Sequence, residues 1–123
     1  MTFLTDRKRA TGLGSSKTGT EHHWHMMVSS AGLALLVPLF ILNFGSILGA
    51  PYEEVIAHYS KPYPAIVAAL TLVAGFLHFK NGVQATIEDY TQGLTRKSLL
   101  IATTCFCYAA AGTGIFSIAR IAL

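Results

Sequence analysis

A single histidine, His78, lies inside a long apolar segment of this 123-residue chain. An ionisable residue within a membrane-spanning segment is costly and marks a functional site by default. On a helix, Gly75 and Gly82 lie three residues before and four residues after His78, on the same face. Because glycine has no side chain, the helix surface on either side of the imidazole is flat and open. A planar macrocycle bound through a histidine nitrogen needs such clearance, so the pattern favours a haem ligand. A neutral histidine in an interhelical hydrogen bond is the structural alternative.

The remaining histidines lie outside the apolar segments, and they are His22, His23, His25 and His58. A haem iron held by two histidines would therefore take its second axial ligand from another chain. Zinc is disfavoured, because no second histidine, cysteine or carboxylate lies one helical turn from His78.

A second candidate site is the run Glu88-Asp89-Tyr90 at the end of the same apolar segment. Tyr90 follows His78 by twelve residues, or about 18 Å along a helix. A tyrosine hydroxyl beside a carboxylate at a membrane surface can donate to a quinone carbonyl and receive protons from water. The alternative is an aromatic anchor flanked by two solvated acids, which is common at such an interface.

A third cluster surrounds Trp24, where His22, His23 and His25 precede the first apolar segment. Tryptophan is typical of the membrane interface. The histidine spacing is not that of a metal site. We therefore interpret the cluster as a headgroup-level group of imidazoles, close to acidic groups of a cofactor.

The elements that must position these residues are three transmembrane helices. The chain is 52% hydrophobic and 12% charged, about half the charged fraction of a soluble domain. Apolar segments at about 26–49, 64–86 and 99–121 are each long enough to cross a bilayer, which takes roughly 20 residues. The fold class is therefore all-α, an integral membrane three-helix bundle over 26–123 preceded by a polar leader, 1–25. Pro38 predicts a kink in the first helix and not its end.

Shorter features complete this picture. The prolines around the first loop bracket a short interfacial helix that we expect at Tyr52–Tyr59. The third segment contains the small residues Ala109–Gly114, which allow close helix packing, within this bundle or against a partner. Cys105 and Cys107 point in different directions on a helix and cannot bridge; both are interpreted as small buried hydrophobes.

The basic residues predict the orientation of the chain. Lysines and arginines concentrate in the leader and around the second loop, whereas the first loop is mainly acidic; the basic residues are Arg7, Lys8, Arg9, Lys17, Lys80, Arg96 and Lys97, with Lys61 alone in the first loop. Basic loops stay on the cytoplasmic side. The N-terminus is therefore expected to be cytoplasmic and the C-terminus to lie on the opposite side. No apolar signal region is seen in the leader.

The string from His78 to Tyr90, His-Phe-Lys-Asn-Gly-Val-Gln-Ala-Thr-Ile-Glu-Asp-Tyr, resembles the motif of the small hydrophobic membrane anchor subunit of succinate dehydrogenase. That enzyme is the succinate:quinone reductase, or respiratory complex II. The leader from Gly12 to Trp24 resembles the N-terminal segment of the alphaproteobacterial form. The length, three spans and orientation are similar too, so the resemblance covers essentially the whole chain.

The resemblance implies a four-subunit enzyme, in which a flavoprotein oxidises succinate and an iron–sulfur subunit passes the electrons on. Two membrane anchors hold haem b and bind ubiquinone. His78 would be one axial ligand of the haem iron, and the second anchor, a cytochrome b subunit, would supply the other. Tyr90 would hydrogen-bond a ubiquinone carbonyl, supported by Asp89. The succinate chemistry would lie on other chains, and no nucleic acid is implied. The expected location is the bacterial inner (cytoplasmic) membrane, with the mitochondrial inner membrane as the alternative.

One departure concerns the entrance to the first span. Family members commonly have a basic residue there, usually arginine, whereas this stretch has none near Met27. Partly protonated imidazoles can pair with carboxylates, so His22, His23 and His25 are expected to contact the haem propionates instead. Two other functions stay open. One is the anchor of a fumarate reductase or another b-type cytochrome quinone oxidoreductase, and the other is a structural anchor without cofactor contact.

Overall fold

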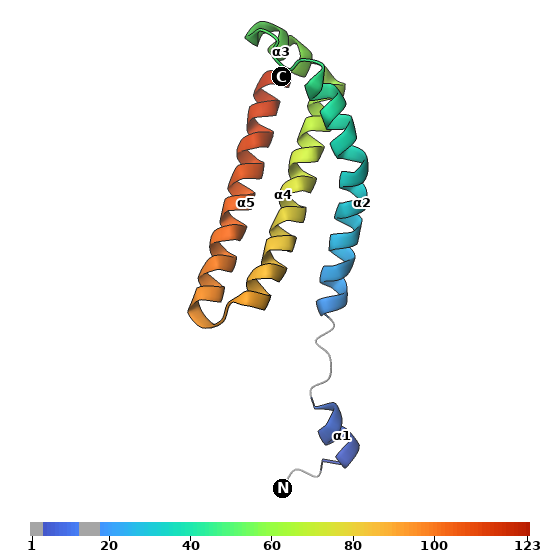
Figure 1. Ribbon diagram of the computed structural model, residues 1–123, viewed down its shortest axis with the longest axis vertical. Coiled ribbons are helices and arrows are strands. Elements are labelled where there is room, and N and C mark those ends of the chain that lie inside the picture. The colour runs from blue at the N-terminus through green and yellow to red at the C-terminus, as the bar shows by residue number, and fades with distance from the viewer. Residues whose placement is uncertain (1–3, 13–17) are drawn as a thin grey trace.

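The computed structural model describes residues 4–12 and 18–123, which form helices joined by short turns. The helices are α1 (Asp6–Thr11), α2 (Thr18–Gly45), α3 (Tyr52–Tyr59), α4 (Pro62–Tyr90) and α5 (Gly93–Ala122), as Figure 1 shows. Three of them are long and apolar enough to cross a membrane, namely Thr20–Gly45 within α2, all of α4 and all of α5. The predicted all-α fold with three membrane-spanning helices is confirmed.

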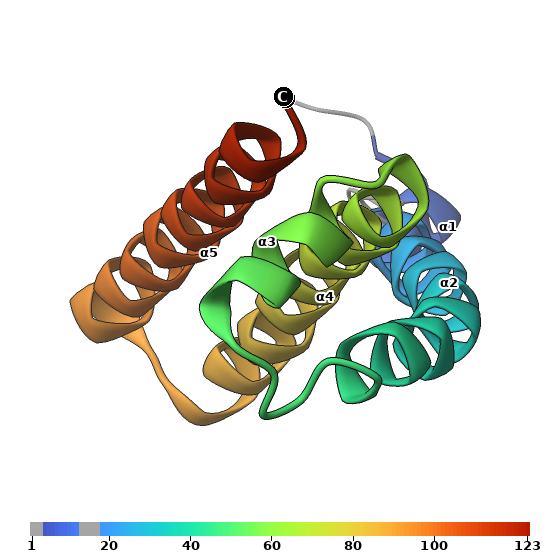
Figure 2. The same ribbon diagram turned by 90° about the horizontal axis from the view of Figure 1, so that it is seen from above.

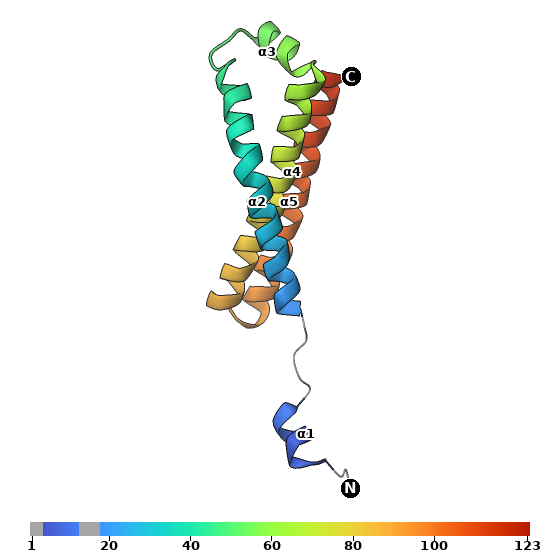
Figure 3. The same ribbon diagram turned by 90° about the vertical axis from the view of Figure 1, so that its right-hand side faces the viewer.

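The long helices extend beyond the predicted apolar segments. Helix α2 begins at Thr18, well before the predicted span, but its end is the exception: it ends at Gly45, short of the predicted 49, and turns occupy residues 46–49. A helix needs no apolar residues to continue into the polar leader, so composition places a span better than it places a helix end. The leader also contains α1, which was not predicted and lies apart from the long helices (Figure 3). The leader residues 13–17, with Lys17 and part of the resemblance to the alphaproteobacterial form, lie outside the described residues.

The three long helices form a row, with α4 in the middle (Figure 2). Helix α4 packs against both α2 and α5, whereas in the described part of the chain the backbones of α2 and α5 do not come close to each other. The buried residues are few and mostly small, and on α4 they include Ala65, Val67 and Ala68. The accessible surface is 9298 Å², whereas a compact protein of 13.2 kDa exposes only about 6,400 Å². Most of the surface of the row is therefore left for lipid or for other chains.

Small residues bring α4 and α5 together, as the composition of the third span suggested. A Cβ atom on Gly114 would lie 2.9 Å from Cδ1 of Leu72, whereas one on Gly112 would meet nothing within 4 Å. Gly114 therefore serves packing within this chain. Cys105 and Cys107 are both free, as predicted. Cys107 is buried, but Cys105 is exposed, so its predicted burial was wrong: residues two apart on a helix face different sides.

Helix α2 continues through Pro38, and its axis changes direction along its length, which agrees with the predicted kink (Figure 2). The short helix α3 covers Tyr52–Tyr59, as predicted, because Pro51 and Pro62 stop the helix from extending either way. Ser60, just after α3, donates to the Ile121 carbonyl at 3.2 Å and ties α3 to the end of α5. Desolvation raises the pKa of the Tyr59 phenol.

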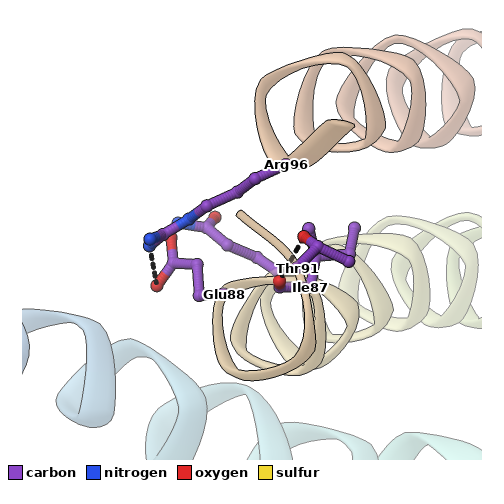
Figure 4. A network of polar contacts seen from close by, with 5 residues as sticks. Ile87, Glu88, Thr91 and Arg96 are labelled. Atoms are coloured by element: carbon purple, nitrogen blue, oxygen red, sulfur yellow. Dashed lines mark hydrogen bonds and ion pairs between the residues drawn. The ribbon is translucent and has the colours of Figure 1, made fainter. Parts of the chain in front are cut away.

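A tight connection joins α4 to α5. The backbone turns through Gly93, whose φ of +64° lies in the left-handed region that favours glycine. The Thr91 amide and hydroxyl both donate to the Ile87 carbonyl, at 3.0 and 2.6 Å. Glu88 pairs with Arg96 at 3.8 Å across the turn, as Figure 4 shows. These contacts fix the end of α4, where the second candidate site lies.

Candidate functional site

His78 lies within α4 and turns its imidazole toward α2. Its Nδ1 atom lies 2.9 Å from Oγ of Ser29, and this hydroxyl lies 3.0 Å from the Met26 carbonyl one helical turn earlier. Both side chains are half-buried. No sequence pattern predicts this pairing, because it joins residues 49 positions apart and depends on how two helices rotate about their axes. The contact occupies one ring nitrogen and leaves Nε2 for another partner.

The two glycines beside His78 leave open space. A Cβ atom on Gly75 would meet nothing within 4 Å, and one on Gly82 would meet only Cε of Met26, at 4.0 Å. An open apolar cavity of about 430 Å³ adjoins Gly75, and its walls include Phe40, Phe79 and Phe106. Nothing in the described chain packs tightly against either glycine, so a flat ligand or another chain has room beside the imidazole.

The three leader histidines do not all line the same groove. His22 and His23 line an open groove of about 740 Å³ together with Met26 and Ala85. Because Met26 is also the nearest side chain to Gly82, this groove adjoins the glycine-lined space. His25 instead lines a groove on the side of Ser29 and lies 3.8 Å from Glu21. The structure therefore separates His23 from His25, with His22 between them.

A polar pocket of about 460 Å³ lies between the beginning of α2 and the last turns of α4. Its lining residues are Glu21, His22, His25, Lys80, Asn81, Gln84 and Glu88. Lys80 was not singled out as a site residue from the sequence, although its place two residues after His78 put it near the end of the span. It brings a basic side chain to the region that lacks the expected arginine. Its Nζ lies 5.8 Å from the centre of the Tyr108 ring.

Asp89 and Tyr90 end α4, and both are exposed. Tyr90 is 85% exposed, so its hydroxyl is available to a ligand or to another subunit. Among the described residues, no hydrogen bond joins Asp89 to Tyr90. The neighbouring Glu88 is held instead, since Gln84 Nε2 donates to it at 3.0 Å and Arg96 pairs with it. The structure thus places a free phenol and a free carboxylate side by side at the end of a fixed helix.

A complete metal site is not found within the described part of this chain, where no three histidine, cysteine, aspartate or glutamate residues come together. His78 could supply one ligand only. A metal bound by His78 would therefore need its other ligands from outside the described residues.

The fold and the site define a small membrane protein of three spans, with a lone imidazole in the middle span and a free tyrosine at its end. Residues 1–116 match the family of succinate dehydrogenase/fumarate reductase transmembrane subunits, and the chain belongs to this family. It is 39% identical over 123 residues to the succinate dehydrogenase hydrophobic membrane anchor subunit of Paracoccus denitrificans, covering 100% of this chain and 95% of that one. No solved structure matches the chain. The family expected from the motif at His78–Tyr90 is confirmed.

Proposed function

We propose that this chain is the small hydrophobic membrane anchor of a succinate dehydrogenase, with a flavoprotein, an iron–sulfur subunit and a second, cytochrome b anchor as its partners. The family match and the relative in Paracoccus support this assignment over the whole chain. The observation that carries the functional part is the environment of His78, where an imidazole in a membrane helix has one nitrogen held and open space beside it.

In this proposal Nε2 of His78 would hold the iron of haem b, and the second anchor would supply a further ligand. The space next to Gly75 and Gly82, where an added Cβ atom would meet nothing closer than 4.0 Å, is the space that the macrocycle would use. Among the leader histidines, His22 and His23 are better placed than His25 to contact the haem propionates, because they line the groove that adjoins Gly82 through Met26. His25 and Lys80 lie in the adjoining polar pocket and add positive character there. When bound, haem b supplies a one-electron carrier near the quinone site.

The quinone contact in this proposal is Tyr90, whose phenol donates a hydrogen bond to a ubiquinone carbonyl. Reduction to the quinol takes two electrons, delivered from succinate through the flavoprotein and iron–sulfur subunits, and two protons taken from water. Asp89 is exposed at the same helix end and can pass protons toward Tyr90. Because Tyr90 is mostly exposed in this chain, the other walls of the quinone pocket come from partner subunits.

The proposed orientation places Tyr90 on the cytoplasmic side of a bacterial inner membrane. The start of α2 and the α4–α5 connection lie at one end of the row, and α3 and the C-terminus lie at the other (Figure 1). Basic residues gather at the first end, which agrees with the rule that positive loops stay in the cytoplasm. The polar leader, 1–25, then lies on the cytoplasmic side, where the soluble subunits would bind.

The test is purification of the complex in mild detergent with His78→Ala, followed by a reduced-minus-oxidised spectrum. We expect the b-type spectrum to disappear or shift, because the variant removes an axial ligand. His58→Ala is the matched control, since His58 lies in α3 at the other end of the molecule. A structural anchor without cofactor contact predicts an unchanged spectrum in both variants, and that result refutes the haem assignment.

The quinone assignment has its own test, Tyr90→Phe, which removes the hydroxyl and keeps the ring. We expect a marked fall in the rate of ubiquinone reduction, with succinate oxidation by an artificial acceptor unchanged. Tyr63→Phe is the control, because Tyr63 is also exposed but lies at the start of α4. The quinone that co-purifies separates a succinate dehydrogenase from a fumarate reductase anchor, since its potential sets the direction of turnover.

A further inference from the structure

We infer that Ser29 is the positioning residue of His78, and that its hydroxyl selects the ring nitrogen that faces a metal. The inference rests on the proposed role of His78 and adds a residue of α2 to that site. Ser29 is half-buried, and its Oγ lies within hydrogen-bond distance of both His78 Nδ1 and the Met26 carbonyl. It is thus the polar side chain of α2 that reaches the imidazole of α4.

The number of protons and lone pairs on each group gives the direction of these two hydrogen bonds. A serine hydroxyl has one proton and two lone pairs, and a backbone carbonyl can only accept. At 3.0 Å the Ser29 hydroxyl donates its proton to the Met26 carbonyl. Its lone pair then accepts from the imidazole at 2.9 Å, which places the ring proton on Nδ1. The other nitrogen, Nε2, is left with a free lone pair, as metal binding requires.

This arrangement also fixes the plane of the ring. Ligating histidines generally donate their other N–H to a neighbouring acceptor, which sets the tautomer and orientation and raises the basicity of the ligand. Here that acceptor lies on a different helix, so the imidazole of α4 is oriented by α2. Loss of such an acceptor typically weakens metal binding by about 10- to 100-fold.

Ser30 provides a matched control within the same turn. Its hydroxyl donates to the same Met26 carbonyl, at 2.8 Å, but Ser30 is exposed, and among the described residues no hydrogen bond joins it to His78. Ser30 instead lines the groove of His22 and His23. Removing the Ser30 hydroxyl therefore changes the same backbone hydrogen bonding and the same helix propensity, without touching the imidazole. A loss that Ser29→Ala causes and Ser30→Ala does not cause therefore reports on the contact with His78.

The experiment uses the full purified complex with Ser29→Ala, Ser29→Val, Ser29→Thr and Ser30→Ala. The measurements are the haem midpoint potential, the low-spin haem signal in electron paramagnetic resonance, and the rate of haem transfer to excess apomyoglobin. We expect Ser29→Ala and Ser29→Val to release haem about 10- to 100-fold faster. Their midpoint potential rises by about 59 mV for each tenfold by which ferric binding weakens more than ferrous binding. Ser29→Thr keeps a hydroxyl and retains values near those of the unmodified complex.

Two results would overturn the inference. One is Ser29→Ala behaving like Ser30→Ala in all three measurements, and the other is Ser29→Thr behaving like Ser29→Val, which has the same shape without the hydroxyl. If the complex with Ser29→Ala fails to assemble, the comparison of Ser29→Thr with Ser29→Val still tests the inference. The proposed function fails separately, through an unchanged spectrum in His78→Ala. If His78→Ala changes the spectrum while the Ser29 variants behave like the unmodified complex, only the positioning role of Ser29 is refuted.

Discussion

Bulky residues at the two glycines beside His78 should remove haem without damaging the chain itself. In Gly75→Val and Gly82→Val the new side chain begins in open space, since an added Cβ meets nothing closer than the Met26 methyl at 4.0 Å. Valine also has a better helix propensity than glycine. The chain alone therefore gives no reason for either variant to be destabilised. A macrocycle in that space would bind the variants less well, because the valine methyl groups would overlap it.

The magnitude follows from the cost of overpacking. Extra methyl groups forced into an occupied space cost about 1–3 kcal/mol, which at about 1.4 kcal/mol per tenfold corresponds to a loss of roughly 5- to 150-fold in haem affinity. The assay is the ratio of haem to flavin in the purified complex, together with the rate of haem transfer to apomyoglobin. Gly112→Val is the control, since Gly112 also faces open space but lies on α5.

Normal haem content and transfer rate in the Gly75→Val/Gly82→Val double variant would refute the reasoning. An alternative role for the glycines predicts a different result. If the glycines serve contact with a partner chain, the variants lose subunits, and haem stays in proportion to the second anchor. Loss of haem with all subunits retained is the outcome that the open space beside the imidazole predicts.

Three further experiments test the packing of the row and the connection between α4 and α5. Gly114→Val should lower the thermal midpoint of the complex relative to Gly112→Val, because only Gly114 packs closely against a leucine of α4. Gly93→Ala should destabilise the chain by about 1–2 kcal/mol, since its positive φ is unfavourable for any residue with a Cβ; an unchanged midpoint would contradict this. A double-mutant cycle with Glu88→Gln and Arg96→Gln should give a coupling of about 1 kcal/mol or less, because the pair is partly solvated. A larger coupling would mean that the partners bury it.

The sequence predicted the spans and the short helix because each has a local cause. Long uncharged runs cross a membrane whatever surrounds them, and two prolines limit α3 on both sides. The helical period alone placed Gly75 and Gly82 on the face of His78. Helix ends were less predictable, because a helix continues into polar sequence, as α2 does when it begins at Thr18.

The contacts between helices could not be predicted in the same way. The pairing of Ser29 with His78 depends on the rotation of α2 and α4 about their axes, and composition does not encode that rotation. The same holds for the three leader histidines, which look like one cluster in the sequence although His23 and His25 line different grooves. Tyr90 illustrates a third limit, since the surroundings of an exposed residue at a helix end are set by chains other than its own.

The arrangement of the three helices in a row has a consequence for the amount of the protein in the cell. A copy without partners exposes both broad faces of α4 to lipid, including the side of the imidazole that another chain and a cofactor are proposed to cover. Polar groups facing hydrocarbon are costly, and little internal packing opposes local opening. Surplus copies should therefore be the ones that membrane proteases remove. The amount of this chain in the cell would then follow the synthesis of its partners, and overproduction of its gene product alone would yield little stable protein.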